Sequence, residues 1–550
     1  MSDPKSSQAK ELPAASSPQG TTLAMGSPKK PAGGNKYALA CAVLASMTSI
    51  LLGYDVAVMS GAGLFIKEDL HVNDTQLEIL AGIINLYSLI GSFAAGRISD
   101  RIGRRYTIVI AAAIFFVGAL MMGLAPNYAA LMAGRFVAGV GVGFALMIAP
   151  VYTAEVAPVS ARGFLTSFPE VFINAGVMLG YVSNFAFAGL PRHLGWRVMF
   201  CVGAVPPVFL AAGVMAMPES PRWLVMQGRL GDARRVLSKT SDSPEEAELR
   251  LEEIKDAAGI PASCVDDVVP VPKRRSRGEG VWRELLLRPT PPVRRIVFAA
   301  LGLQFFQQAS GIDSVVLYAP RVFDKAGIKS QTNTLGATVA VGATKASFIL
   351  VATFLLDRVG RRPLLLASAG GMVASLLGLG TGLTLVDRHH GQRHTWAVAL
   401  SVATVLTFVA SFSIGLGPIA WVYCSEIFPL RLRAQGNSLG AAMNRTMSGV
   451  ISMTFLSLSK AITTGGAFFL YSGIATAGWL FFYVFLPETR GRTLEEVEIL
   501  FTRETDPPKD RAADATGGEV PLGNTTTYGR SISYRQNAGP NGQEHQGIRV

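Results

Sequence analysis

Two ionisable residues of opposite charge stand inside apolar stretches that are long enough to cross a membrane. Asp55 lies in YALACAVLASMTSILLGYDVAVMSGAG, which begins at Tyr37, and Arg135 lies in AALMAGRFVAGVGVGFALMIAP, which begins at Ala129. An ionised side chain at the bilayer centre costs roughly 2.5–3.5 kcal/mol on insertion scales, so such residues usually face a polar cavity or a partner. We therefore expect Asp55 and Arg135 to pair. A buried acid that a cation can pair with, and that a proton can neutralise, is suited to coupling proton movement to transport.

The composition indicates which elements must position these residues. The chain has 550 residues, of which 49% are hydrophobic and only 16% are charged, and its mean hydropathy is +0.35. A helix that spans a bilayer needs about 20 apolar residues. Runs of this kind are expected at 37–60, 77–98, 106–124, 128–151, 164–187, 197–217, 293–319, 334–357, 363–385, 396–424, 436–459 and 465–486. The sequence predicts an all-α membrane protein with twelve transmembrane helices.

The net charge of +12 comes largely from short loops between these runs, such as 97–106, 357–362 and 429–434. The intervening loop 125–128 carries no charge. Basic loops stay in the cytoplasm by the positive-inside rule. This pattern predicts that both termini are cytoplasmic and that the partner of the basic charge is the lipid bilayer, not nucleic acid.

Three groups of residues recur in the same order, about 260–270 residues apart. Asp100-Arg101-Ile102-Gly103-Arg104-Arg105 matches Asp357-Arg358-Val359-Gly360-Arg361-Arg362, Glu155 and Arg162 match Glu426 and Arg433, and Pro218-Glu219 matches Pro487-Glu488. The chain is therefore expected to contain two pseudo-repeats of six helices, an arrangement that places a substrate site between the halves near the membrane midplane.

This repeat predicts five segments. They are a disordered cytoplasmic N-terminal tail at 1–36, a first six-helix half at 37–217, a cytoplasmic loop with short helices at 218–292, a second half at 293–486, and a cytoplasmic C-terminal helix with a disordered tail at 487–550. Ser243-Pro244-Glu245-Glu246 predicts a helix start within the loop, with proline at the first helical position.

The duplicated acids and arginines suggest a charge network that joins the cytoplasmic ends of the helices, because arginine can bind a carboxylate through two nitrogens. Residues seven apart on one helix share a face, so Glu155 with Arg162, and Glu426 with Arg433, are expected to act together. The proposed latch comprises Asp100, Arg104, Arg105, Glu155, Arg162, Glu219, Arg222, Asp357, Arg361, Arg362, Glu426 and Arg433. The alternative is that the arginines only anchor the topology, which leaves the repeated acids unexplained.

These motifs resemble the sugar porter family of the major facilitator superfamily. The resemblance covers roughly residues 37–500. It rests on Gly53-Tyr54-Asp55, Gly134-Arg135-Phe136, Pro150 to Glu155, Pro218 to Arg222, Gln307-Gln308-Ala309-Ser310-Gly311-Ile312, Gly415 to Trp421, and Pro487 to Gly491. Within the family, the chain is most similar to plant polyol/monosaccharide proton symporters. The resemblance implies the major facilitator fold.

The resemblance also implies a sugar site. It would contain Gln307, Gln308, Trp421 and Asn444, with Gln304 an open case. Amides donate and accept hydrogen bonds, as hydroxyl groups do, and the tryptophan could cover an apolar face of the substrate. The alternative for the amides is hydrogen bonding between helices.

Three ionisable residues depart from the usual pattern of this family. Glu170, Asp313 and Lys345 stand where many members carry amides, and Arg445 follows the retained Asn444. Glu170 and Lys345 could pair across the cavity. We assign Glu170, Asp313 and Lys345 to the substrate site, because charge-assisted hydrogen bonds favour a flexible substrate that is rich in hydroxyl groups.

The expected function is proton-coupled symport of polyols (sorbitol, mannitol, xylitol, myo-inositol) and monosaccharides by alternating access, by a monomer in the plasma membrane. The alternatives are a facilitative sugar uniporter and a transport-inactive sugar sensor. No cofactor is expected, since the proton gradient drives the cycle. An enzyme is not expected, because no nucleophile elbow or phosphate loop is present. No metal is expected either, and His389, His390 and His394 are assigned to a solvated loop.

Overall fold

The computed structural model describes residues 35–158, 161–261, 264, 266–269, 282–328, 330–388, 395–429 and 432–490. Within these ranges the chain is helical, and no strand forms beyond one isolated bridge between Arg229 and Val268. Residues 1–34 of the predicted N-terminal tail, residues 491–550 with the predicted C-terminal helix, and the histidines at 389, 390 and 394 lie outside the described residues. The first helix begins at Lys36, one residue earlier than predicted.

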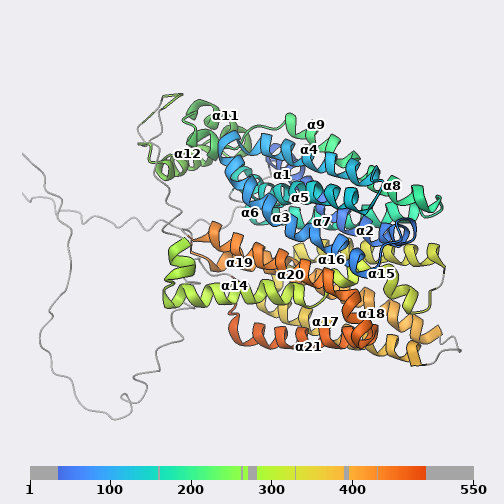
Figure 1. Cartoon of the computed structure of the whole chain (residues 1–550). Helices are drawn as coiled ribbons and strands as arrows, with labels where there is room; N and C mark the ends of the chain where they lie inside the picture. The colour runs from blue at the N-terminus through green and yellow to red at the C-terminus, as the bar shows by residue number, and fades with distance from the viewer. Residues whose placement is uncertain are drawn as a thin grey trace, which may run out of the picture. The chain divides into compact units, whose positions relative to one another are not determined.

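Six helical spans make up the first half (Figure 1). They are α1 Lys36–Ser46 continued through the 3₁₀ turn η1 Met47–Ser49 into α2 Ile50–Asp69, then α3 Asp74–Ile102, α4 Arg104–Gly123, α5 Tyr128–Val156, α6 Arg162–Thr166 with α7 Phe168–Ala186, and α8 Arg192–Val202 with α9 Val205–Met215. Among the described residues that follow, the short elements are α10 Pro221–Met226, α11 Leu230–Thr240, α12 Pro244–Ala258 and the π-helical turn η3 Arg283–Leu287. Helix α12 begins where predicted, and the Ser243 hydroxyl caps it by accepting from the N–H of Glu246.

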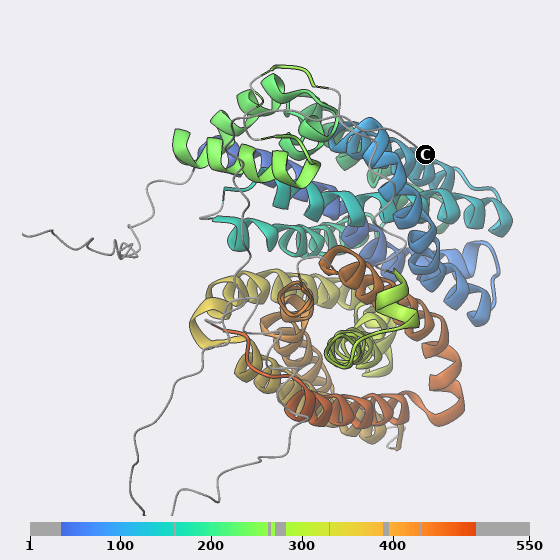
Figure 2. The ribbon, with the colours of Figure 1, turned by 90° about the vertical axis from the view of Figure 1, so that its left-hand side faces the viewer.

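The second half repeats this plan over the described residues (Figure 2). Its spans are α14 Pro291–Ala309 with α15 Ile312–Lys325, α16 Gln331–Val359, α17 Arg361–Arg388, α18 Thr395–Ile414 with α19 Leu416–Ile427, α20 Arg433–Ile462 and α21 Thr464–Phe485. The two halves meet along α3 and α20, α7 and α16, and α2 and α15. The expected all-α fold of twelve spans is confirmed.

Ten of the twelve spans are long and apolar enough to cross a membrane by composition alone. The other two are α14 with α15, and α20. The first is broken near Gly311 and carries three glutamines, while the second carries Asn444 and Arg445. Polar residues in a membrane helix are expensive and usually serve a function. We therefore expect the functional site to include residues of α14, α15 and α20, the spans that are least apolar.

Breaks in the helices have local causes. Gly311 has φ +85°, and a Cβ atom there would collide with the ring of Tyr471. Farther along α15, Pro320 has no N–H to donate to the carbonyl of Val316, four residues earlier. That carbonyl instead accepts a hydrogen bond of 2.5 Å from the Tyr181 hydroxyl on α7. The proline thus supplies an acceptor for a contact between the halves.

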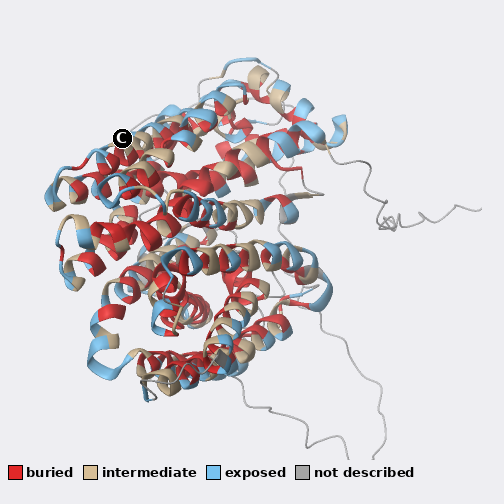
Figure 3. Cartoon of the chain, turned by 90° about the vertical axis from the view of Figure 1, so that its right-hand side faces the viewer, coloured by how far each residue is buried: buried red, intermediate tan, exposed pale blue. Residues whose placement is uncertain are grey.

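The outer surface of the helices is apolar. Phe93, Phe209 and Phe354 are 69%, 71% and 67% exposed, and Figure 3 shows exposed segments on the helices beside buried ones. A soluble monomer rarely exposes so many large apolar groups. In a bilayer they face lipid, as a protein with many membrane spans requires.

Candidate functional site

Asp55 and Arg135 form an ion pair between α2 and α5, with side chains that are 1% and 0% exposed. One nitrogen of Arg135, Nη1, donates to Asp55 Oδ2. The second carboxylate oxygen, together with Nε and Nη2 of Arg135, has no partner among the residues that the structure describes. The ring of Phe200 lies 5.8 Å from the guanidinium carbon. The predicted partners therefore do meet, and a single hydrogen bond joins them.

The predicted amide residues form one buried cluster. Asn444 Nδ2 donates to Gln304 Oε1 at 2.8 Å and to Gln307 Oε1 at 2.5 Å. Gln308 Nε2 donates to Asn444 Oδ1 at 3.2 Å. Gln307 Nε2 donates to the carbonyls of Leu416 and Gly417, at the start of α19. In this arrangement the amides join α14, α19 and α20, which is the helix-joining role that the sequence left open.

One acceptor in this cluster remains unused. Gln308 Oε1 is buried and has no partner within the described chain. A buried acceptor without a donor costs about 1–3 kcal/mol, so a hydroxyl group that reached it would be stabilised. Trp421 lies on α19 and is partly exposed. The ligand role of these residues therefore stays a prediction, and Gln308 is the amide best prepared for it.

Four charges from four helices gather beside the amides. Glu170 lies on α7, Asp313 on α15, Lys345 on α16 and Arg445 on α20. Glu170 is close enough to Lys345 and Arg445 for electrostatic attraction, and Asp313 attracts the same two cations. The group is balanced, with two charges of each sign. It also joins the halves, because Glu170 belongs to the first half and the other three belong to the second.

The arrangement differs from a simple Glu170–Lys345 pair. No ion-pair contact joins these two side chains in the described structure. Glu170 Oε1 instead accepts from Asn174 Nδ2 at 3.5 Å, and Asp313 accepts from the Ser448 hydroxyl. The structure therefore shows electrostatic attraction between Glu170 and Lys345 without a direct contact.

Arg445 holds Asn444 in place. Its Nε and Nη2 donate to Asn444 Oδ1 at 3.1 and 2.6 Å, and its Nη1 lies 3.5 Å from Asn85 Oδ1 on α3 of the first half. This contact directs the Asn444 NH₂ group toward the glutamines. Arg445 lies inside a predicted span, and the signal that singled out Arg135 could have placed it among the site residues.

The duplicated loops form a compact ion-pair network at the basic end of the first half. Arg104 donates to Glu155 through Nε at 3.0 Å and Nη2 at 3.2 Å. The Ser220 hydroxyl donates to the same carboxylate at 2.5 Å. Glu219 accepts from the backbone N–H of Arg104 at 2.8 Å, so it caps the start of α4, where the helix dipole favours an anion. Gly103, with φ +96°, brings the backbone close enough for this contact.

Burial raises the pKa of Glu219, while backbone N–H groups of Ser220, Arg104 and Arg105 act in the opposite direction. These N–H groups compensate a carboxylate that would otherwise be costly to bury.

The second half repeats this network almost atom for atom. Arg361 donates to Glu426 through Nη2 at 2.9 Å and Nε at 3.2 Å. Thr489 takes the place of Ser220 and donates to Glu426 at 2.7 Å. Glu488 accepts from the N–H of Arg361 at 3.1 Å, beside Gly360 with φ +105°. Glu488 was absent from the predicted latch, although its match with Glu219 in the repeat could have identified it.

The expected helical pairing of these acids with the next arginine is wrong. Glu155 and Arg162 do not share a helix, because α5 ends before Pro158 and α6 begins at Arg162. Proline disfavours a helical residue before it. Likewise, Glu426 belongs to α19 while Arg433 begins α20. The carboxylates bind the arginine of the duplicated loop in their own half. The side chain of Arg162 lies outside the described part.

The remaining residues of the predicted latch differ in their exposure and in their contacts. Asp100 is 76% exposed and contacts Arg104 at 3.3 Å. Arg105 and Arg362 each donate to a carbonyl near the end of the last helix of their half. Arg222 is exposed on α10 and forms no ion pair within the described chain, so its expected place in the latch is a further correction. The side chain of Asp357 is not among those described.

Comparison with known proteins identifies the chain. Residues 41–501 match the family model described as "Sugar (and other) transporter". The chain belongs to this sugar transporter family. It is 70% identical over 475 residues to "Polyol transporter 5" of Arabidopsis thaliana, covering 86% of this chain and 88% of that one. It is 32% identical over 471 residues to "Glucose transporter GlcP" of Staphylococcus epidermidis, covering 86% and 98%.

Solved structures of sugar transporters are similar as well. The proton:xylose symporter XylE, a major facilitator superfamily protein, matches with a TM-score of 0.69 at 28% identity over 85% of this chain and 99% of that one. A partially occluded inward open form of XylE from E. coli gives a TM-score of 0.69 at 26% identity over 83% and 100%. The major facilitator fold and a multi-pass membrane location are thereby established for this family member.

Proposed function

We propose that this protein is a proton-coupled symporter of polyols and monosaccharides that works by alternating access. The observation that carries the proposal is the isolated ion pair between Asp55 and Arg135 inside the first half. A carboxylate held by one hydrogen bond can leave its cation when the helices move, and protonation would then remove the cost of its buried charge. The similarity to a polyol transporter and to a proton:xylose symporter supports the same function.

The polyol preference rests on the four charges at the centre. A linear polyol carries hydroxyl groups along its whole length, so it can meet Glu170, Asp313, Lys345 and Arg445 at once. Hydrogen bonds to charged groups contribute about 1.5–3 kcal/mol, more than neutral ones. The substrate would enter the space between the two halves and replace their mutual attraction. Sorbitol, mannitol, xylitol and myo-inositol are the proposed substrates, together with hexoses.

We also propose the orientation, the membrane and the oligomeric state of the protein. The basic end of the helices is cytoplasmic, as are both termini, and the membrane is the plasma membrane. The protein acts as a monomer and is a transporter rather than an enzyme. It needs no cofactor, because the proton gradient drives transport. The basic loops around Arg104 and Arg361 support this orientation by the positive-inside rule.

Uptake into yeast that lacks its own polyol transporters tests the proposal. Labelled sorbitol, myo-inositol and glucose would be supplied separately, with and without a protonophore. We expect sorbitol to accumulate above its external concentration, and the protonophore to abolish that accumulation. Equilibration without accumulation would indicate a uniporter, and no uptake of any substrate by protein at the cell surface would indicate a sensor. Either outcome overturns proton symport.

A further inference from the structure

Asp74 joins three cations at the end of the molecule opposite the basic loops. It is the first residue of α3, and its Oδ1 lies 2.6 Å from Lys67 Nζ on α2 and 3.2 Å from Arg321 Nη1 on α15. Its Oδ2 lies 2.5 Å from Lys460 Nζ on α20. Lys67 belongs to the first half, whereas Arg321 and Lys460 belong to the second. One carboxylate, 17% exposed, therefore ties the halves together.

Glu78 makes a second connection one turn deeper. Residues four apart lie on the same face of a helix, so Glu78 and Asp74 both face the second half. Glu78 is fully buried and accepts from the N–H of Ser457 at 2.7 Å and from its hydroxyl at 2.5 Å. An N–H in the body of a helix ordinarily bonds its own helix. Glu78 therefore competes with the backbone of α20, as only a strong acceptor does.

Two tyrosines lie near Glu78 but bind other groups. Tyr318 on α15 and Tyr471 on α21 are close enough to interact with it electrostatically. Tyr318 donates to the carbonyl of Ser452 at 2.7 Å, and Tyr471 shares a hydrogen bond with Ser314. Neither phenol hydroxyl is bonded to Glu78. The cations that Asp74 binds, Lys67, Arg321 and Lys460, lie one turn outward.

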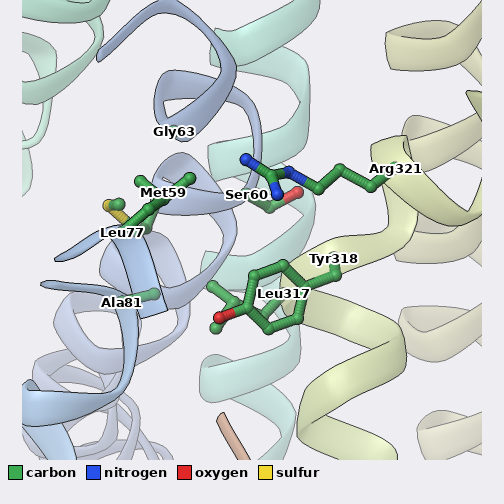
Figure 4. Close-up of a pocket in the computed structure, with 8 residues that line it drawn as sticks. All are labelled: Met59, Ser60, Gly63, Leu77, Ala81, Leu317, Tyr318 and Arg321. Carbon is green, nitrogen blue, oxygen red and sulfur yellow. The ribbon is translucent and has the colours of Figure 1, made fainter. Parts of the chain in front are cut away.

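A small cavity lies beside this double contact, between α2, α3 and α15 (Figure 4). Figure 4 shows Arg321 extending from α15 toward α2, with Ser60 near its guanidinium group. The Ser60 hydroxyl is buried and has no partner among the described residues. The cavity is lined by Met59, Ser60, Gly63, Leu77, Ala81, Leu317, Tyr318 and Arg321. It therefore lies where α2 and α3 of the first half meet α15 of the second half.

We propose that Asp74 and Glu78 form an external clasp, which holds the two halves together on the extracellular side and must open in each transport cycle. The clasp consists of Asp74 with Arg321 and Lys460, and Glu78 with Ser457. Both carboxylates come from α3, and every one of these partners comes from the second half. The assignment of this end to the outside rests on the proposed orientation and function.

A nearby acid provides a matched control. Asp69 ends α2 at the same end of the molecule and accepts from Arg197 Nη1 at 2.8 Å and Trp196 Nε1 at 3.0 Å. Both partners lie on α8, in the same half as Asp69. Removal of this carboxylate's charge breaks an ion pair of similar exposure without releasing a contact between the halves.

A cysteine in the cavity can report the opening of the clasp. Gly63→Cys is suitable because a Cβ atom there would meet no atom closer than 3.5 Å. In a background without native cysteines, the rate at which a membrane-impermeant reagent labels this introduced thiol would be measured in whole cells. We expect Asp74→Asn and Glu78→Gln each to raise this rate about ten-fold, as the loss of one charge-assisted contact permits. Asp69→Asn should leave the rate unchanged.

Two further variants test whether each protein reaches the cell surface and how much the Ser457 hydroxyl contributes. Gly189→Cys, where a side chain meets nothing within 4 Å, should label at one rate in every background and so report that each variant reaches the surface. Ser457→Ala removes only the hydroxyl donor and should raise the labelling of the cavity thiol less than Glu78→Gln does. Unchanged labelling of the cavity thiol in Asp74→Asn and Glu78→Gln, or an equal rise in Asp69→Asn, overturns the clasp.

Labelling is measured without substrate, so its outcome does not depend on what is transported. If the clasp variants label faster but no polyol or sugar is taken up, the clasp stands and the proposed substrate falls. If symport is present but labelling does not respond, the clasp falls alone. Labelling from the cytoplasmic side only would reverse the proposed orientation and also overturn an external clasp.

Discussion

At the scale of single residues, the proposed proton coupling depends on the ion pair of Asp55 and Arg135. Asp55 and Arg135 are both inaccessible to solvent, yet a single hydrogen bond joins them and three of their polar atoms lack a partner in the described structure. A saturated, bidentate pair would be stronger and more difficult to separate. The single hydrogen bond between Asp55 and Arg135 therefore suits the proposed role, in which the carboxylate exchanges its cation for a proton.

Replacement of this acid should separate coupling from substrate movement. Asp55→Asn keeps the shape of the side chain but cannot release a proton. We expect it to abolish accumulation while exchange of labelled for unlabelled sorbitol continues. Uptake and exchange would be measured in the same vesicles with an imposed proton gradient. Accumulation against a gradient by the variant would show that the proton is carried elsewhere.

The four charged residues near the amide cluster should determine which substrate the protein prefers. Glu170→Gln with Lys345→Asn removes one charge of each sign and leaves Asp313 and Arg445 balanced. We expect the double variant to lose sorbitol uptake at least about ten-fold more than glucose uptake, since charged hydrogen bonds are lost. Each single change should be worse than the double, because it leaves an uncompensated charge. Competition uptake with both substrates checks this. An equal loss for both substrates, or singles milder than the double, would contradict it.

At the scale of elements, each half carries its own copy of one structural device. A glycine with positive φ, at 103 or 360, lets a carboxylate cap the next helix, and the first arginine of that helix binds a glutamate from the end of α5 or α19. The device fixes three helix ends relative to one another. Each half can then move as a unit.

Loss of either arginine should loosen its half. Arg104→Ala and Arg361→Ala each break a partly buried ion pair with two nitrogen contacts, whose side chains are 9–23% exposed. We expect a loss of about 1–3 kcal/mol in stability, between the values for exposed and for buried pairs, with reduced uptake. Thermal unfolding in detergent and surface expression would be measured together. Arg222→Ala is the control, and an effect as large as that of Arg104→Ala would refute this account.

At the scale of the whole molecule, polar contacts between the described residues join the two halves at more than one helix pair. Asp74, Glu78 and Tyr181 of the first half bind residues of the second. Glu170 attracts its partners across the same interface. Movement of the halves must therefore break charged contacts at the outer end and rearrange charges at the centre.

The energy for this movement should come from the proton gradient. With one proton for each substrate, a membrane potential of 100 mV supplies about 2.3 kcal/mol, or roughly fifty-fold accumulation. Each unit of pH difference adds about 1.4 kcal/mol, a further factor of about ten. We expect the steady-state accumulation of sorbitol in vesicles to follow both quantities. An accumulation ratio that does not change with the pH difference would exclude symport of this stoichiometry.

The sequence by itself determined the class of fold, and it predicted that Asp55 meets Arg135 and that the duplicated acids meet arginines. Apolar runs of bilayer length and a repeat spaced by about 260–270 residues predicted the twelve spans, because membrane thickness dictates helix length. Isolated charges inside those runs identified Asp55 and Arg135, since lipid makes such residues costly. Arg445 and Glu78 carry the same signal. The repeat could also have identified Glu488, which matches Glu219 but was not included in the predicted latch.

Only the tertiary structure decided which residues meet. Spacing along the chain suggested that Glu155 would act with Arg162, but a proline ends the helix between them and the carboxylate meets Arg104, 51 residues away. Gln304 and Gln307 on α14 both accept a hydrogen bond from Asn444 on α20, because these two helices pack against each other. Asp74 and Glu78 meet partners more than 240 residues distant. Such contacts depend on how the helices pack, which local pattern and periodicity do not specify.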